Sequence, residues 1–168
     1  MATYTADQFA PFVVKLGGAT IDKLSHKGDG SATFKAGDLI SLAADGTVNL
    51  ALQSDTDTAG AVHGMILETV DTAVTSQLPI LRFAIDTVIA MQVDGAAPST
   101  KAVGTTHLLN RDVAGRYNVG AADAKGPIRI VGFPTDVRGY DPLADSTATD
   151  GYTYVSVATQ AVLDSRSA

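Results

Sequence analysis

Alternation of apolar and polar residues at every second position is the feature that most constrains this chain. One parity of the segment 81–93 is almost entirely apolar: Leu81, Phe83, Ile85, Thr87, Ile89, Met91 and Val93. The other parity holds Arg82, Asp86 and Gln92. Because successive side chains of a strand point to opposite faces of a sheet, one face of this segment is predicted to be buried and the other exposed. The run is longer than most strands, so we expect either one strand that bends at a barrel corner or two strands.

A second alternating segment predicts a hairpin. The apolar run 39–42 leads to Asp45-Gly46, after which apolar and polar residues alternate over 47–52. An Asp-Gly pair between two such runs is typical of a primed β-turn.

Further strands are predicted at 61–70, 105–109, 116–119, 128–133 and 152–163. No span of eleven or more residues has apolar groups at helical spacing with suitable caps. The predicted fold class is therefore all-β. Closing the sheet would remove unpaired edges, so we expect a compact β-barrel or β-sandwich of short antiparallel strands.

The first 33 residues lack a sustained period, and glycines interrupt them. The sequence predicts an extended N-terminal arm over 1–33 and a β-barrel domain over 34–168.

Composition narrows the functional classes. The chain has no cysteine, which excludes disulfides and thiolate chemistry. Twelve Lys and Arg against eighteen Asp and Glu give a net charge of -6, so we expect no nucleic-acid partner. No run of about 18 apolar residues is present, so we expect no membrane partner. Charged residues make up 18% of the chain, which predicts a largely small and neutral surface suited to packing against protein.

Motifs for catalysis or cofactor binding are absent from the sequence. His26, His63 and His107 lie far apart and none forms a metal-binding pair, so we interpret them as structural. There is no Gly-x-Ser-x-Gly elbow and no phosphate-binding loop. The sequence therefore predicts no catalytic, cofactor or metal site, and a protein that is not an enzyme.

Four residues are candidates for an interface between subunits. Tyr152 and Tyr154 share one parity of the last strand, as do Arg82 and Asp86 in the long alternating run. Arg82 and Asp86 could form an ion pair within the sheet or between subunits, and an exposed pair of this kind contributes only about 0–1 kcal/mol.

Three segments resemble the opening of a small domain found in phage head proteins. They are FKAGDLISL at 34–42, DGTVNLA at 45–51 and GAVHGMILETV at 60–70. This order of an Ala-Gly-Asp-Leu turn, an Asp-Gly turn and a Gly-punctuated strand resembles that of the decoration, or cement, proteins of tailed bacteriophages. The resemblance extends over about residues 34–133, and outside that range it is only general.

The resemblance implies a homotrimer bound to the outer surface of the capsid, with the major capsid protein as its partner. The protein would be made in the host cytoplasm and located in the virion. In this interpretation the arm contacts the capsid by strand addition through its apolar residues. These are Tyr4, Phe9, Phe12, Val13 and Val14. The alternative for the arm is a strand that completes the barrel of its own or a neighbouring chain.

The second hypothesis is a carbohydrate-binding or head-fibre adhesion module, in which Tyr117, Tyr152 and Tyr154 form a sugar platform. The absence of tryptophan and the low aromatic content of 6% weaken it. An enzyme whose site is assembled from loops is a third, weaker hypothesis.

Overall fold

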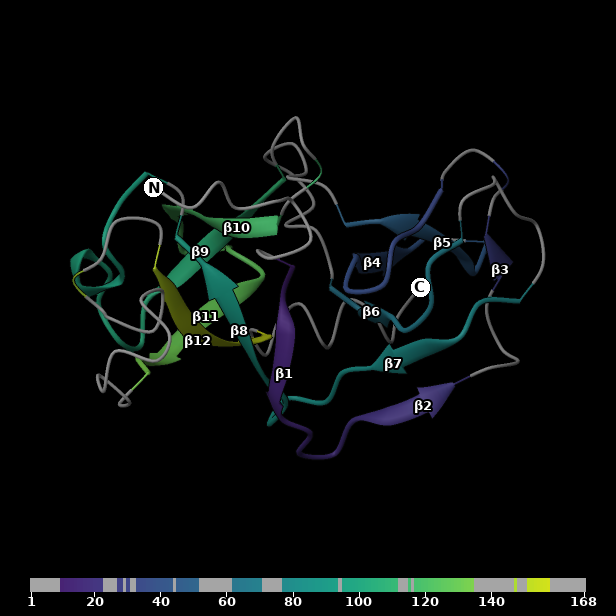
Figure 1. Ribbon diagram of the computed structural model, residues 1–168, viewed down its shortest axis with the longest axis horizontal. Coiled ribbons are helices and arrows are strands. Elements are labelled where there is room, and N and C mark those ends of the chain that lie inside the picture. The colour runs from purple at the N-terminus through teal and green to yellow at the C-terminus, as the bar shows by residue number, and fades with distance from the viewer. Residues whose placement is uncertain are drawn as a thin grey trace.

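The structure is a computed structural model of the whole chain, and a defined set of residues is described here. These are residues 10–22, 27–28, 30, 33–43, 45–51, 62–70, 77–93, 95–111, 115, 117–134, 147 and 151–157. The chain is all-β, as the alternation predicts (Figure 1). A three-residue 3-10 helix, η2 (Pro98–Thr100), follows the turn after β8.

Twelve strands are formed by the described residues. In chain order they are β1 (Phe12–Lys15), β2 (Thr20–Asp22), β3 (Lys27–Gly28), β4 (Leu39–Leu42), β5 (Thr47–Leu50), β6 (Gly64–Ile66), β7 (Ile80–Arg82), β8 (Val88–Gln92), β9 (Thr106–Arg111), β10 (Tyr117–Ala122), β11 (Ile128–Gly132) and β12 (Tyr152–Val157).

The strands form two curled sheets that lie next to each other along the long axis of the molecule (Figure 1). The first sheet has the order β1-β8-β10-β9-β11-β12, and β12 also pairs with β8. Strands β8, β10, β9, β11 and β12 are therefore linked in a closed ring, with β1 added beside β8. The second sheet has the order β2-β7-β6-β4-β5-β3. Most pairings are antiparallel, and β3–β5 and β8–β10 are parallel.

The N-terminal segment contributes strands to both sheets. Strand β1 pairs with β8, with Phe12 opposite Ala90. Strand β2 pairs with β7, with Ile21 opposite Leu81. Of the two alternatives for the arm, the described residues 12–15 and 20–22 thus follow the one in which the arm pairs within its own chain.

The predicted hairpin is formed by β4 and β5, with Leu42 opposite Val48. Its loop is longer than a two-residue Asp-Gly turn. The amide of Ala43 donates to the carbonyl of Thr47, and the amide of Gly46 donates to the carbonyl of Ala43. Gly46 has a φ of 79°, which favours glycine at this place in the loop. Asp45 Oδ1 accepts the amide of Thr47 at 2.9 Å and fixes the start of β5.

The long alternating run divides into two strands, β7 and β8, which belong to different sheets. The buried hydroxyl of Thr87 lies in the turn between them. Thr87 Oγ1 accepts the amide of Ala84 at 2.9 Å and donates to the carbonyl of Leu16 at 3.0 Å. Thr87 is 1% exposed, whereas Ile85 in the same turn is 52% exposed. Within the strands the apolar parity of the run is therefore largely buried, whereas Ile85 in the turn is exposed.

The two sheets share a hydrophobic core. The largest cluster combines the interior of the ring, including Ile89 and Val155, with Leu39 and Met65 of the second sheet. A smaller cluster around Phe34 lies within the second sheet. The ring is thus filled by side chains and is packed against the second sheet as one body.

Close approach of two strands explains Gly64. A Cβ built on Gly64 would lie 2.2 Å from the carbonyl oxygen of Leu81, whereas one built on Gly132 meets only the Tyr154 ring at 4.0 Å. From the sequence, Gly64 marks either a bulge or a close approach of two strands, and the structure shows the close approach.

We expect Gly64→Ala to lower the free energy of unfolding by about 1–3 kcal/mol, because β6 and β7 must separate to admit the methyl group. Gly132→Ala is the matched control in another strand and should change it by less than about 1 kcal/mol. Urea unfolding of the three proteins measures both values. Equal effects of the two substitutions would contradict the close-approach explanation.

Candidate functional site

The outward side of β1, β8, β12 and β11 presents an aromatic and apolar surface, called the outer face below. It begins with the alternation of β12. Thr153, Val155 and Val157 are buried in the ring, while Tyr152, Tyr154 and Ser156 are half-buried on the outward side. Strand β12 therefore shows the two-sided pattern that the sequence predicts.

Register across the sheet places one row of large and small residues on the outer face. Phe12 is opposite Ala90, Ala90 is opposite Tyr154, and Tyr154 is opposite Gly132. Directly opposed residues of neighbouring strands point to the same side of a sheet. Tyr154 leans toward Gly132, and Ala90 is only 1% exposed although it points outward. The aromatic side chains thus cover the small residue between them.

The aromatic rings of the outer face are in contact. The ring centroids of Phe12 and Tyr152 are 5.5 Å apart at an interplanar angle of 76°, an edge-to-face contact. Those of Tyr152 and Tyr154 are 6.4 Å apart. Such aromatic contacts contribute about 0.5–1.5 kcal/mol each beyond buried area, which fixes the ring positions.

Exposed apolar residues of β1 and β11 extend this surface on both sides. Phe12 is 48% exposed, Val14 of β1 is 45% exposed and Val131 of β11 is 41% exposed. A contiguous apolar surface rimmed by polar groups is typical of a protein–protein contact.

The residues predicted to contact the capsid are not all on the outer face. Phe12 and Val14 are on the outer face, whereas Val13 is opposite Ile89 and packs on the core. Tyr4 and Phe9 lie outside the described residues.

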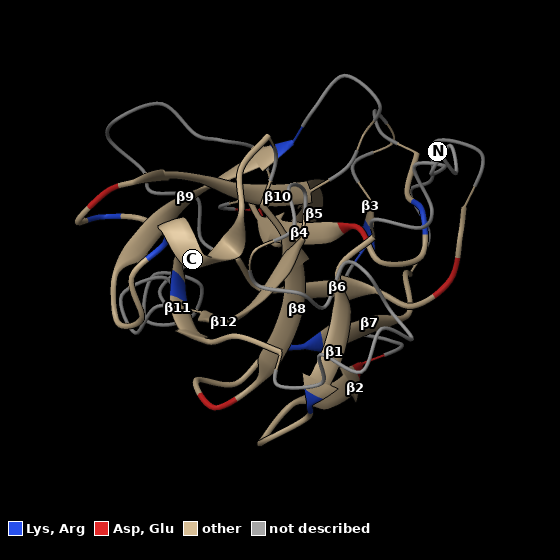
Figure 2. Cartoon of the chain, turned by 60° about the vertical axis from the view of Figure 1, so that its left-hand side comes forward, with Lys and Arg blue, Asp and Glu red and all other residues tan. Residues whose placement is uncertain are grey.

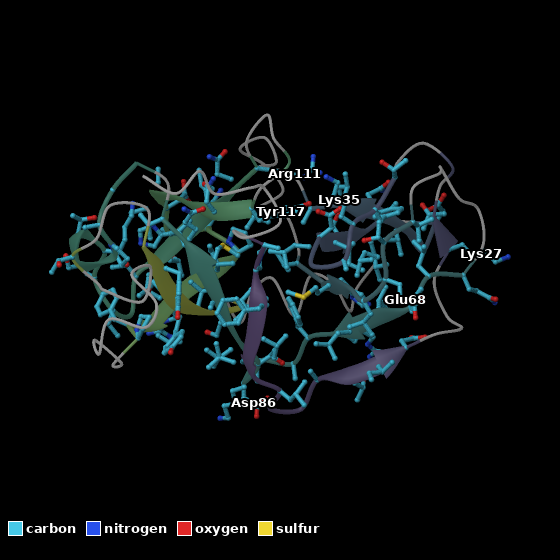
Figure 3. The ribbon with its side chains drawn as sticks, viewed as in Figure 1. Lys27, Lys35, Glu68, Asp86, Arg111 and Tyr117 are labelled. Atoms are coloured by element: carbon cyan, nitrogen blue, oxygen red, sulfur yellow. The ribbon has the colours of Figure 1, made fainter. Side chains whose placement is uncertain are left out.

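The predicted subunit-interface residues are divided between the sheets. Tyr152 and Tyr154 are on the outer face, but Arg82 is in β7 of the second sheet. Asp86 lies in the turn before β8, at the lower end of β1 in Figure 3, where its Oδ1 accepts the amide of Gly18 at 2.8 Å. No ion pair joins Arg82 to Asp86 in the described part of the chain. The structure therefore brings Phe12 together with Tyr152 and does not bring Arg82 to the tyrosines.

The predicted sugar platform of Tyr117, Tyr152 and Tyr154 is wrong for Tyr117. Tyr117 is 1% exposed, and its hydroxyl donates to the carbonyl of Leu39 at 2.9 Å. The alternation of β10 points Tyr117 into the junction between the sheets, where it has no access to a sugar. Phe12 takes the third aromatic position beside Tyr152 and Tyr154.

A buried polar cluster joins the two sheets at Tyr117 (Figure 3). Arg111, at the end of β9, lies over the Tyr117 ring with its guanidinium carbon 5.4 Å from the centroid. Arg111 Nη2 is 3.9 Å from Asp38 Oδ1, and Asp38 Oδ2 accepts the amide of Lys35 at 2.7 Å. These contacts tie the turn before β4 to β9 and β10.

Burial controls the ionisation of this cluster. Loss of solvent raises the pKa of Asp38. The hydrogen bond from the Lys35 amide and the positive charges of Arg111 and Lys35 lower this pKa, but by less. Burial also raises the pKa of Tyr117, with a further contribution from the charge of Asp38. A carboxyl group with a perturbed pKa is a candidate for chemistry. Here its oxygens are occupied by the turn amide and the guanidinium, so its contacts are those of a structural clamp.

The histidines are interpreted as structural in the sequence, and the described ones have structural contacts. His107 is 2% exposed, its Nδ1 is 3.1 Å from the carbonyl of Gly120, and its Nε2 is 2.9 Å from Thr105 Oγ1. His63 is 8% exposed, and His26 lies outside the described residues. Within the described ranges, no three His, Asp or Glu side chains are grouped closely enough to hold a metal ion. The same residues contain no helix long and apolar enough to span a bilayer.

Comparison with known proteins gives no family assignment. No protein-family model matches the chain, and no curated protein matches it at a significant level.

Sequence reasoning missed three outer-face residues, Lys15, Arg129 and Val131. Arg129 is exposed and opposite Ser156, and Lys15 is exposed and opposite Val88. The alternation of 128–132 was a signal for an exposed Arg129 and Val131. Their position beside the tyrosines depends on strand order, which the alternation does not determine.

We expect Asp38→Asn to change the pH dependence of stability. Because the pKa of Asp38 is raised in the folded chain, protonation favours folding. The wild type should therefore gain free energy of unfolding relative to Asp38→Asn as the pH falls from the raised pKa toward the ordinary aspartate pKa of 3.8.

Asp45→Asn is the control of opposite sign, because hydrogen bonds from the side chain and amide of Thr47 lower the pKa of Asp45. Relative to Asp45→Asn, the wild type should lose stability as the pH falls below 3.8. Urea unfolding across this pH range measures both differences. A wild type that loses stability relative to Asp38→Asn on acidification would show that the charge of Arg111 dominates burial.

Proposed function

We propose that the chain is a non-enzymatic capsid decoration protein. It would bind the outer surface of a phage head, with the major capsid protein as partner, and stabilise the expanded shell. The observation that carries the proposal is the exposed, ordered aromatic surface in which Phe12 is fixed against Tyr152. A rigid all-β body with such a surface can bind a protein lattice with little loss of conformational entropy. The sequence resemblance over 34–133 is the second support.

The outer face, rather than the edge of β1, is the proposed contact. Strand β1 has an irregular register between Val13 and Lys15, and its final residue is a lysine. Bulges and edge lysines are devices that hinder the addition of a further strand. The side chains of Phe12 and Val14 remain accessible, so the arm would contact the capsid through its side chains.

Stabilisation requires a difference in affinity between two states of the shell. A protein that binds the expanded lattice better than the precursor shifts the equilibrium toward the expanded form. At a free concentration of 100 times Kd, each occupied site would add about 2.7 kcal/mol to the bound state. A homotrimer on the capsid surface would increase this effect, since three linked contacts bind with a high effective concentration.

Co-sedimentation with precursor and expanded heads of the phage that encodes the chain tests the proposal. We expect tighter binding to expanded heads and a higher temperature for their disruption when the protein is bound. Equal affinity for both shells, or no binding to either, would contradict it.

Phe12→Ala should weaken binding to expanded heads about fivefold or more, because truncation of an aromatic anchor in a contact costs more than about 1 kcal/mol. Ile21→Ala is the matched control, since Ile21 is 63% exposed but lies in β2 of the second sheet. It should leave the affinity within about twofold. Equal losses from the two substitutions would remove the outer face from the contact.

The second candidate is a carbohydrate-binding or adhesion module, which the contact of Phe12, Tyr152 and Tyr154 favours. Saccharide-specific binding on a glycan array that is lost in Phe12→Ala, with no binding to heads, would favour this candidate over the first.

A further inference from the structure

We infer that the outer face docks on a patch of the capsid surface that presents two carboxylates along one edge of an apolar area. This inference rests on the proposed function and names the chemistry of the partner surface. It follows from the placement of charge on β1, β8, β12 and β11.

These four strands contain two charged residues, and both are cations. Strands β8 (VIAMQ) and β12 (YTYVSV) have none, β1 (FVVK) has Lys15 and β11 (IRIVG) has Arg129. Figure 2 shows β8 and β12 without acidic or basic colour. The whole chain, in contrast, carries a net charge of -6. The four strands of the outer face therefore carry positive charge, whereas the chain as a whole is negative; Asp86 lies in the turn that adjoins them.

The two cations lie in one row across the sheet. Lys15 is opposite Val88, Val88 is opposite Ser156, and Ser156 is opposite Arg129. Three strand spacings of about 4.8 Å separate the backbones of Lys15 and Arg129 by about 14 Å. The row is two residues, or about 7 Å, from the row of Phe12, Ala90 and Tyr154. Positive charge thus lies at two points along one edge of the apolar and aromatic strip.

Both side chains are placed to meet an outside carboxylate. They are exposed, and no ion pair involves either one in the described part of the chain. Arg129 Nε donates to the carbonyl of Gly104 at 3.1 Å, which orients the guanidinium. Asp86 is an acidic residue near the end of β1, but its Oδ1 accepts the amide of Gly18 and forms no ion pair with Lys15.

Charge also argues for the capsid over a second copy of the chain. Two chains of net charge -6 repel each other at long range. Face-to-face contact of two copies would bring four cations together around the apolar strip. A capsid patch with carboxylates about 14 Å apart satisfies both cations and covers the aromatic strip.

The test compares two charge-reversed double variants in co-sedimentation with expanded heads at low and at high salt. One carries Lys15→Glu and Arg129→Glu. The matched control carries Lys27→Glu in β3 and Arg82→Glu in β7, two exposed residues of the second sheet, with the same change in net charge. We expect wild-type binding to weaken with salt, the outer-face variant to lose at least tenfold in affinity at low salt, and the control to stay within about threefold.

The single variant Lys15→Glu is a control for misfolding. Replacing Arg129 removes a hydrogen bond to a backbone carbonyl, whereas Lys15 is an exposed edge residue. It should lose affinity with an unchanged melting temperature. Heads that bind wild type, control and outer-face variant equally would overturn the inference and leave the proposed function standing. A wild type that binds neither shell would overturn both. A change of solution mass in the outer-face variant, with unchanged binding to heads, would assign the face to a second copy and overturn the inference.

Discussion

Packing of the second sheet against the ring is the constraint on which the rest of the structure depends. Leu39 and Met65 share a core cluster with Ile89 and Val155 of the ring. Tyr117 strengthens the junction, because its hydroxyl donates to the carbonyl of Leu39 and its ring lies under the guanidinium of Arg111. A buried hydroxyl and carboxylate are tolerated at this junction because each has a defined partner.

This junction also determines how the chain is routed. Strand β7 ends in the second sheet and β8 begins in the ring, so the turn between them must cross the junction. The hydroxyl of Thr87 accepts the turn amide of Ala84 and donates to the carbonyl of Leu16, which brings the end of β1 to the same place. One buried threonine thereby fixes both the crossing and the position of β1 beside β8. The outer face exists because β1 is held there.

The outer face and the buried cluster place their polar groups differently. At the junction, burial raises the pKa of Asp38, and its oxygens are occupied by neighbouring groups. On the outer face, the exposed cations Lys15 and Arg129 lie in the row next to rings that are fixed by one another. The first arrangement stabilises the molecule, and the second is the one suited to binding. The proposal of a docking protein follows from this difference.

The sequence by itself determined the fold class, the hairpin of β4 and β5 and the two-sided pattern of β12. Each depends on side-chain alternation or on glycine, which act over a few neighbouring residues. Only the tertiary structure decided that 81–93 divides between two sheets, that Tyr117 is buried, and that Phe12 meets Tyr152. It also decided that Lys15 and Arg129 share a row. Alternation assigns a residue to one side of its strand, but strand order and register determine its neighbours, and these arise from pairings between segments far apart in the chain.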